Sequence, residues 1–171
     1  DLQRYRYEGT ENDINLPENK GKRAIGTENQ AECHIIQMKE EYPKEVGGLM
    51  WMAMGNAEHS VYLPTFGGIT DTHEAYKVPG VNYNPSSAYW TFRGLSTLAE
   101  LDRVNYGQGV RNYWKQYELE LIKAQEEVDK KVVELAKKDT KAAAMYMTET
   151  GIATAEDAIG KANEIHSQLY T

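Results

Sequence analysis

The pattern of hydrophobic and polar positions changes along the chain and divides it into four zones. Residues 1–26 are polar and rich in turn formers, although residues 2–7 alternate and predict a short strand. Residues 27–64 carry two strand patterns that predict a hairpin. Residues 65–85 are rich in Gly, Thr and Asn, which predicts a surface loop. Residues 86–171 show helical spacing, so we expect an α+β chain that is a single domain or a fragment of a larger one.

Two different strand patterns stand in the extended zone. Residues 27–38 alternate between an apolar face, which includes Cys33, and a face that carries Glu32 and His34. Leu49–Met54 is apolar without alternation, which is typical of a strand covered on both faces. A helix is the alternative for that run, but the flanking glycines favour a strand. A chain of this size has little material for both covering layers, so we expect one layer to come from elsewhere.

The helical zone contains two apolar stripes. The first helix is expected from residue 86 or 87 to about 106. Apolar residues spaced by three and four over residues 110–135 then predict a long helix of roughly 40 Å. Asp139 breaks this pattern and predicts the cap of a short helix, and Thr154 starts a sequence that resembles a capping box for the last helix. Two such helices most simply pack as an antiparallel hairpin against each other and the sheet.

Composition and charge exclude several classes of function. The chain has 19 Lys and Arg against 26 Asp and Glu, a net charge of −7, which argues against the basic footprint of a nucleic-acid-binding protein. Its longest apolar run is too short to span a membrane. The single cysteine, Cys33, allows no internal disulfide and fits a reducing compartment. We therefore expect a cytoplasmic protein that binds neither nucleic acid nor a membrane.

A few polar residues are candidates for chemistry. Glu32 and His34 share one face of a strand and could form an acid–base pair or hold a metal, although a hydrogen-bonded polar pair at a sheet edge is the plainer interpretation. Asn56 follows the apolar strand, where its amide could stabilise an oxyanion or simply form a turn. A small metalloenzyme that adds His59 and His73 to Glu32 and His34 is a further alternative, but no spacing demands it.

Cys33 is not expected to be a nucleophile. Alternation places it on the apolar face, where cysteine usually acts as a small hydrophobic residue. A reactive cysteine instead needs an electropositive and partly exposed setting. The sequence also contains no P-loop, GxGxxG, HExxH, CxxC or GxSxG motif.

Three sequence segments resemble the C-terminal part of the bacterial dipeptidase A family. They read GTENQAECHIIQ, GGLMWMAMGNAEHSVYLPTFGGI and SAYWTFRGLSTLA. This family consists of cysteine peptidases of the N-terminal-nucleophile (Ntn) hydrolase superfamily. The resemblance implies a four-layer αββα sandwich and cleavage of dipeptides by an N-terminal cysteine, whose own α-amino group acts as the base. It implies no metal and no cofactor.

The chain departs from the family at its first residue, because Asp1 is not Cys, Ser or Thr and Cys33 is internal. The resemblance therefore implies that the nucleophile belongs to a missing N-terminal portion and that this chain alone is inactive. No catalytic residue is assigned in this chain, and Glu32, His34 and Asn56 are candidates to line the site. The alternative is a non-catalytic interaction module whose apolar sheet face pairs with a partner or with a second copy.

Overall fold

The computed structural model describes residues 16–19, 27 and 29–170. The chain is α+β, as predicted, with an antiparallel sheet followed by long helices. The strand expected at residues 2–7 lies outside the described residues. The elements in chain order are η1 (Pro17–Asn19), β1 (Glu32–Gln37), β2 (Leu49–Met54), β3 (Leu63–Phe66), α1 (Glu74–Lys77), α2 (Ala88–Leu101), the π-helix η2 (Arg103–Gly107), α3 (Gln108–Lys138) and α4 (Thr140–Leu169).

The sheet has β2 in the middle, paired antiparallel with β1 and with β3. The prediction of a strand for Leu49–Met54 is confirmed. A tight turn precedes this strand, and Gly47 adopts a φ of 69° there. A side chain at Gly47 would also lie 3.1 Å from the Cα of Gly67. Only glycine fits both conditions, so Gly47 allows the loop before β2 to lie against the chain that follows β3.

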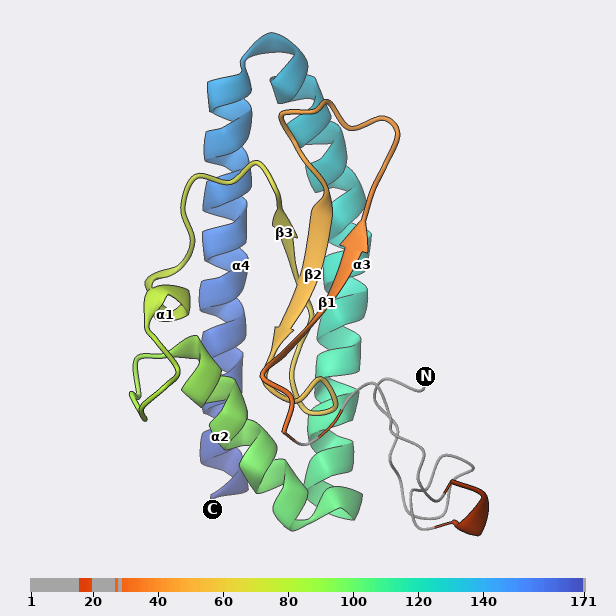
Figure 1. Cartoon of the computed structure of the whole chain (residues 1–171), viewed down its shortest axis with the longest axis vertical. Helices are drawn as coiled ribbons and strands as arrows, with labels where there is room; N and C mark the ends of the chain where they lie inside the picture. Colours follow the sequence, from red (N-terminus) through yellow and green to blue (C-terminus); the bar gives the residue numbers. More distant parts are fainter. Residues whose placement is uncertain (1–15, 20–26, 28, 171) are drawn as a thin grey trace.

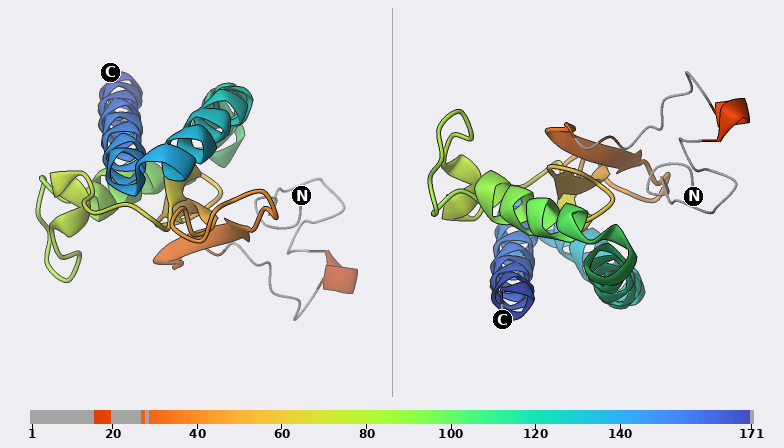
Figure 2. Two further views of the ribbon diagram at one scale, coloured as in Figure 1. Left: turned by 90° about the horizontal axis from the view of Figure 1, so that it is seen from above. Right: turned by 90° about the horizontal axis from the view of Figure 1, so that it is seen from below.

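The described residues cover β2 only in part. Leu49 and Ala53 are fully buried, whereas Met50, Trp51 and Met52 are partly exposed. β3 contacts α3 and α4, and β1 lies farthest from these helices (Figure 2). The layer that would complete the burial of β2 on both faces is therefore not supplied by the residues that the structure describes.

The helices α3 and α4 form the antiparallel hairpin that the sequence predicted (Figure 1), and both lie on the same side of the sheet (Figure 2). Asp139 caps α4 by accepting hydrogen bonds from the N–H groups of Lys141 and Ala142 at 2.9 and 3.1 Å. The expected short helix and new start at Thr154 are wrong, because α4 is continuous from Thr140 to Leu169. The Thr154 hydroxyl donates to the Thr150 carbonyl instead of capping a helix. The run of good helix formers after residue 140 outweighs the local capping pattern.

Two other predicted boundaries shift. α2 ends at Leu101 rather than near residue 106, because the chain changes to the π-helix η2. The predicted loop at 65–85 contains the end of β3 and the single turn α1, which His73 caps by accepting a hydrogen bond from the Ala75 N–H. None of the described helices has a stretch long and apolar enough to cross a membrane.

Two apolar clusters join the sheet to the helices. The upper cluster, near the α3–α4 turn, includes Leu49, Phe66, Val132, Ala136, Ala143 and Met147. The lower cluster, near the other ends of the helices, includes Val61, Leu63, Phe92, Leu95, Val110, Trp114, Ala158 and Ala162. Both clusters therefore draw side chains from β-strands, α3 and α4.

Candidate functional site

The densest group of buried polar residues follows β2 directly. The segment from Gly55 to Ser60 is buried throughout, although it contains Asn56, Glu58 and His59. The Asn56 side-chain oxygen accepts a hydrogen bond of 2.8 Å from the Glu58 N–H, which is the geometry of an Asx turn. The Asn56 amide nitrogen lies 3.4 Å from Glu100 Oε1. The Asn56 side chain thus stabilises the turn after β2 and contacts Glu100 on α2.

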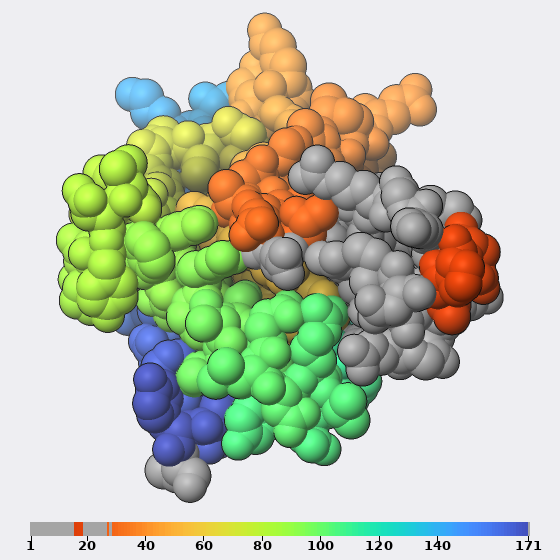
Figure 3. Space-filling model, turned by 60° about the horizontal axis from the view of Figure 1, so that its bottom comes forward, coloured from red at the N-terminus to blue at the C-terminus, as the bar shows by residue number. Residues whose placement is uncertain are grey.

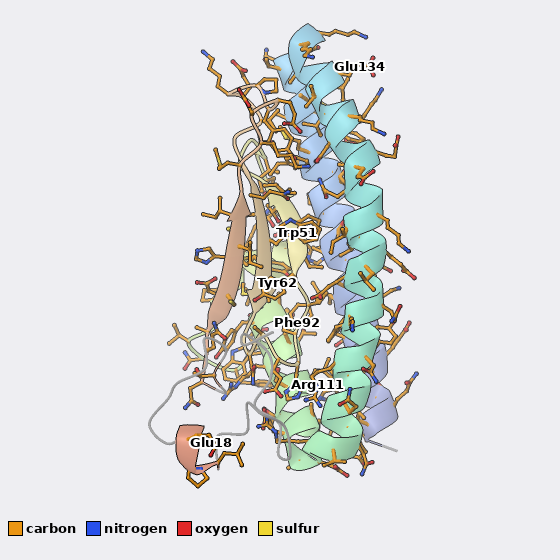
Figure 4. All side chains as sticks on the ribbon, turned by 90° about the vertical axis from the view of Figure 1, so that its right-hand side faces the viewer. Glu18, Trp51, Tyr62, Phe92, Arg111 and Glu134 are labelled. Atoms are coloured by element: carbon orange, nitrogen blue, oxygen red, sulfur yellow. The ribbon has the colours of Figure 1, made fainter. Side chains whose placement is uncertain are left out.

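Glu58 is held by two arginines from different elements. Nη2 of Arg103, in η2, lies 2.9 and 3.0 Å from the two carboxylate oxygens, and Nη1 of Arg111, in α3, lies 3.0 Å from Glu58 Oε1. Arg103 also donates to Glu100 Oε2 at 2.8 Å. We call Glu58, His59, Glu100, Arg103 and Arg111 the strand-end network. Figure 4 shows Arg111 near the lower end of α3.

The two carboxylates of this network sit in different electrostatic settings. Burial raises the pKa of the Glu58 carboxyl, against the opposing effect of the Arg103 guanidinium. Burial also acts to raise the pKa of Glu100, but the nearby His59 and Arg103 outweigh it and lower that pKa overall. Two carboxylates thus face two guanidinium groups, and the buried pair of Glu58 and Arg111 is joined by the partly exposed Glu100 and Arg103.

His59 has no exposed surface and links the parts of the network. Its Nε2 lies 3.3 Å from Nη1 of Arg111, and its Nδ1 lies 3.4 Å from Glu100 Oε1. A guanidinium can only donate, so this contact requires a lone pair on Nε2 and places the ring proton on Nδ1, facing Glu100. The His59 carbonyl accepts a hydrogen bond of 3.1 Å from the Trp114 indole. Gly107 permits this packing, because a Cβ there would lie 3.1 Å from His59 Nε2.

The network contains metal-ligand residue types but is built as an ionic cluster. Among the described residues, only Glu58, His59 and Glu100 bring three potential ligand atoms within 4.8 Å of one another. Arg111 occupies the position between Glu58 and His59 Nε2, and Arg103 spans Glu58 and Glu100. A divalent cation would have to displace guanidinium groups that already neutralise the carboxylates. The arrangement favours a structural role that fixes the turn after β2 to η2 and α3.

The structure keeps the predicted chemical residues apart. His34 Nδ1 lies 2.9 Å from Glu32 Oε2 on β1, and both side chains are about half exposed, as expected of a polar pair at a sheet edge. His73 caps α1, and His59 is buried in the strand-end network. Among the described residues, the four side chains of the metalloenzyme alternative therefore do not come together as one group of ligands. Within the described part of the chain, no hydrogen bond or ion pair joins Asn56 to the pair on β1.

Cys33 lies where alternation placed it, on the apolar face of β1. It is buried and pairs in register with Ala53, and its sulfur accepts a hydrogen bond of 3.0 Å from the Tyr62 hydroxyl. It forms a small apolar cluster with Ala53, Ala57 and Tyr62. This is the setting of a packed side chain rather than of a nucleophile.

Comparisons with known proteins agree with one another. Residues 1–116 match peptidase family C69. The chain is 32% identical over 145 residues to a protein named "Probable dipeptidase B" from Streptococcus pyogenes serotype M1, and 28% identical over 128 residues to "Dipeptidase A" from Lactobacillus helveticus. These matches cover 85% and 74% of this chain but only 29% and 27% of the relatives. The chain thus spans less than a third of the length of either protein.

Proposed function

Since the chain belongs to peptidase family C69, we propose that it is the C-terminal portion of a dipeptidase whose nucleophile lies outside these residues. The match to relatives named dipeptidases, over most of this chain and less than a third of their length, is the observation that carries the proposal. It confirms the resemblance to the dipeptidase A family found in the sequence.

The catalytic group we propose is an N-terminal cysteine of the longer protein. Its thiolate attacks the carbonyl of the dipeptide, and its own α-amino group serves as the base. Cys33, the single cysteine of this chain, supports an external nucleophile because it is buried and hydrogen-bonded to Tyr62. The described residues contribute a sheet and its supporting helices, which fit one half of an αββα sandwich.

Dipeptide hydrolysis by the longer protein tests this proposal. We expect activity that is abolished when the N-terminal cysteine is replaced by alanine and retained in the matched variant Cys33→Ala. The 171-residue chain alone is expected to give no turnover. Turnover by this chain that disappears in Cys33→Ala would show that the nucleophile is internal and that the proposal is wrong.

An interaction module is the second candidate, and the exposed apolar residues of β1 favour it. Ile35, Ile36 and Met38 are all exposed on the strand or directly after it. A longer protein that lacks dipeptidase activity but binds a partner through this strand would support this candidate over the first.

A further inference from the structure

His59 lies at the centre of the strand-end network and is held there tightly. Its side chain has no exposed surface, and a Cβ at Gly107 would lie only 3.1 Å from Nε2. The charged groups around the ring come from every element packed on it: Glu58 from the turn after β2, Glu100 from α2, Arg103 from η2 and Arg111 from α3. Because the ring has no room to swing away, these side chains must respond to any change in its charge.

The observed contacts of His59 suit the neutral ring alone. Nε2 lies 3.3 Å from Nη1 of Arg111, and Nδ1 lies 3.4 Å from Glu100 Oε1. A proton on Nε2 would point an N–H at a guanidinium, which has donors and no acceptor. It would also place two positive charges side by side where water does not screen them. The contact between His59 and Arg111 therefore cannot survive protonation of the ring.

A carboxylate oxygen lies just beyond this contact. Glu58 Oε1 is 3.9 Å from His59 Nε2, so a movement of about 1 Å brings it within hydrogen-bond distance. Arg103 already holds both oxygens of Glu58 without the help of Arg111. Arg111 has other acceptors, since its Nη2 lies 3.4 Å from the Arg103 carbonyl oxygen and 3.2 Å from the side-chain oxygen of Gln108. Both Glu58 and Arg111 thus keep hydrogen-bond partners if their own contact is broken.

We propose that the strand-end network is a proton-operated switch, in which protonation of His59 transfers Glu58 Oε1 from Arg111 to the imidazolium. The proton comes from solvent and takes the lone pair of Nε2, and no bond between heavy atoms is made or broken. Glu100 and Arg103, with 26% and 28% of their side chains exposed, connect the ring to solvent. Figure 3 shows α2, η2 and the start of α3 at the surface of this end of the molecule, in green. In the protonated state Arg111 no longer ties the turn after β2 to α3. The inference does not depend on the proposed function, because every residue in it is described.

Nitrogen NMR of the longer protein, labelled with ¹⁵N-histidine and ¹⁵N-arginine, tests the exchange. The two imidazole nitrogens resonate far apart in a neutral ring and converge when the ring is protonated. We expect those of His59 to converge as the pH is lowered from about 8 to about 5, the range in which histidine ordinarily changes its charge. The guanidinium resonances of Arg111 should shift with the same midpoint. A His59 that stays neutral over this range, or that gains a proton while the Arg111 resonances remain unchanged, would overturn the proposal.

A pair of matched variants gives a second readout, the hydrogen exchange of the η2 amides. After correction for the direct effect of pH on exchange, these amides should exchange roughly tenfold faster in the protonated state of the unsubstituted protein. His59→Gln should abolish this change, because its amide can accept from Arg111 and donate to Glu100 but gains no proton. His34→Gln, at a half-exposed position on β1, should keep it. An equal change in both variants would contradict the proposal. If His59→Gln does not fold, the NMR titration of the unsubstituted protein still decides the question.

Discussion

Replacement of Arg111 by methionine should destabilise the protein by about 3 kcal/mol. The variant keeps an unbranched side chain but removes the 3.0 Å contact to Glu58 and the 3.3 Å contact to His59 Nε2. Glu58 and Arg111 are both buried. Removal of one partner from a buried ion pair costs about 3–5 kcal/mol, and the lower end applies because Arg103 still holds both oxygens of Glu58.

Urea unfolding followed by far-UV circular dichroism measures this loss. For a protein of this size, 3 kcal/mol corresponds to a fall in melting temperature of roughly 6–12 °C. Lys138→Met is the matched control on the same helix, because it removes a 2.7 Å ion pair with Glu134 in which both side chains are more than half exposed. Figure 4 shows Glu134 at the opposite end of α3 from Arg111. The control should leave the free energy of unfolding nearly unchanged, because an exposed ion pair on a helix surface contributes little.

A double variant separates the ion pair from general packing. Glu58→Gln combined with Arg111→Met should be less destabilised than the sum of the two single variants, by about 0.5–3 kcal/mol, because neither charge is then left without its partner. If Arg111→Met lowers the free energy of unfolding no more than Lys138→Met does, the buried strand-end network does not stabilise the turn after β2, and the reasoning is refuted.

Three further predictions concern the helices. Tyr117→Phe removes a 2.7 Å hydrogen bond to Asp157, the largest cause that lowers the pKa of that carboxyl, so an NMR titration should show this pKa rising toward its usual range. The pKa of Glu100 is lowered from its usual value of 4.5. Its charged form therefore stabilises the fold above pH 4.5, and this stabilisation is lost as the pH falls through the lower pKa of the folded state. Glu100→Gln should flatten the acid side of the stability profile measured by urea unfolding. Asp139→Ala should cost about 1 kcal/mol through loss of the cap on α4, whereas Thr154→Ala should cost far less; equal thermal shifts would contradict the assignment of the helix start.

Elements with a strong local signal could be predicted from the sequence. The unalternating run Leu49–Met54 between glycines became β2, and the regular apolar stripe of residues 110–135 became α3. The break at Asp139 was also visible, because an acidic residue interrupts the stripe just before a run of helix formers. The prediction of a helix start at Thr154 was wrong because a capping pattern describes only a few residues, whereas the continuity of α4 depends on its whole length and its packing.

The strand-end network had no sequence signal that could reveal it. Glu58 lies 45 residues from Arg103 and 53 from Arg111, and no periodic pattern connects positions so far apart. The polar sequence from Asn56 to Ser60, placed directly after an apolar strand, was the one available hint that a buried polar group needed partners. The Glu32–His34 contact, in contrast, followed from the two-residue repeat of a strand and was predicted correctly.

The sharing of α3 and α4 between the upper and lower clusters has a consequence for cooperativity. Val132 and Met147 belong to one cluster and Trp114 and Ala158 to the other, on the same two rigid helices. Because both clusters pack on α3 and α4, loss of packing in one cluster would also weaken the packing of the other. We therefore expect the two halves of the helical layer to melt together in a single transition, without a stage in which one end of the hairpin has come apart and the other is intact.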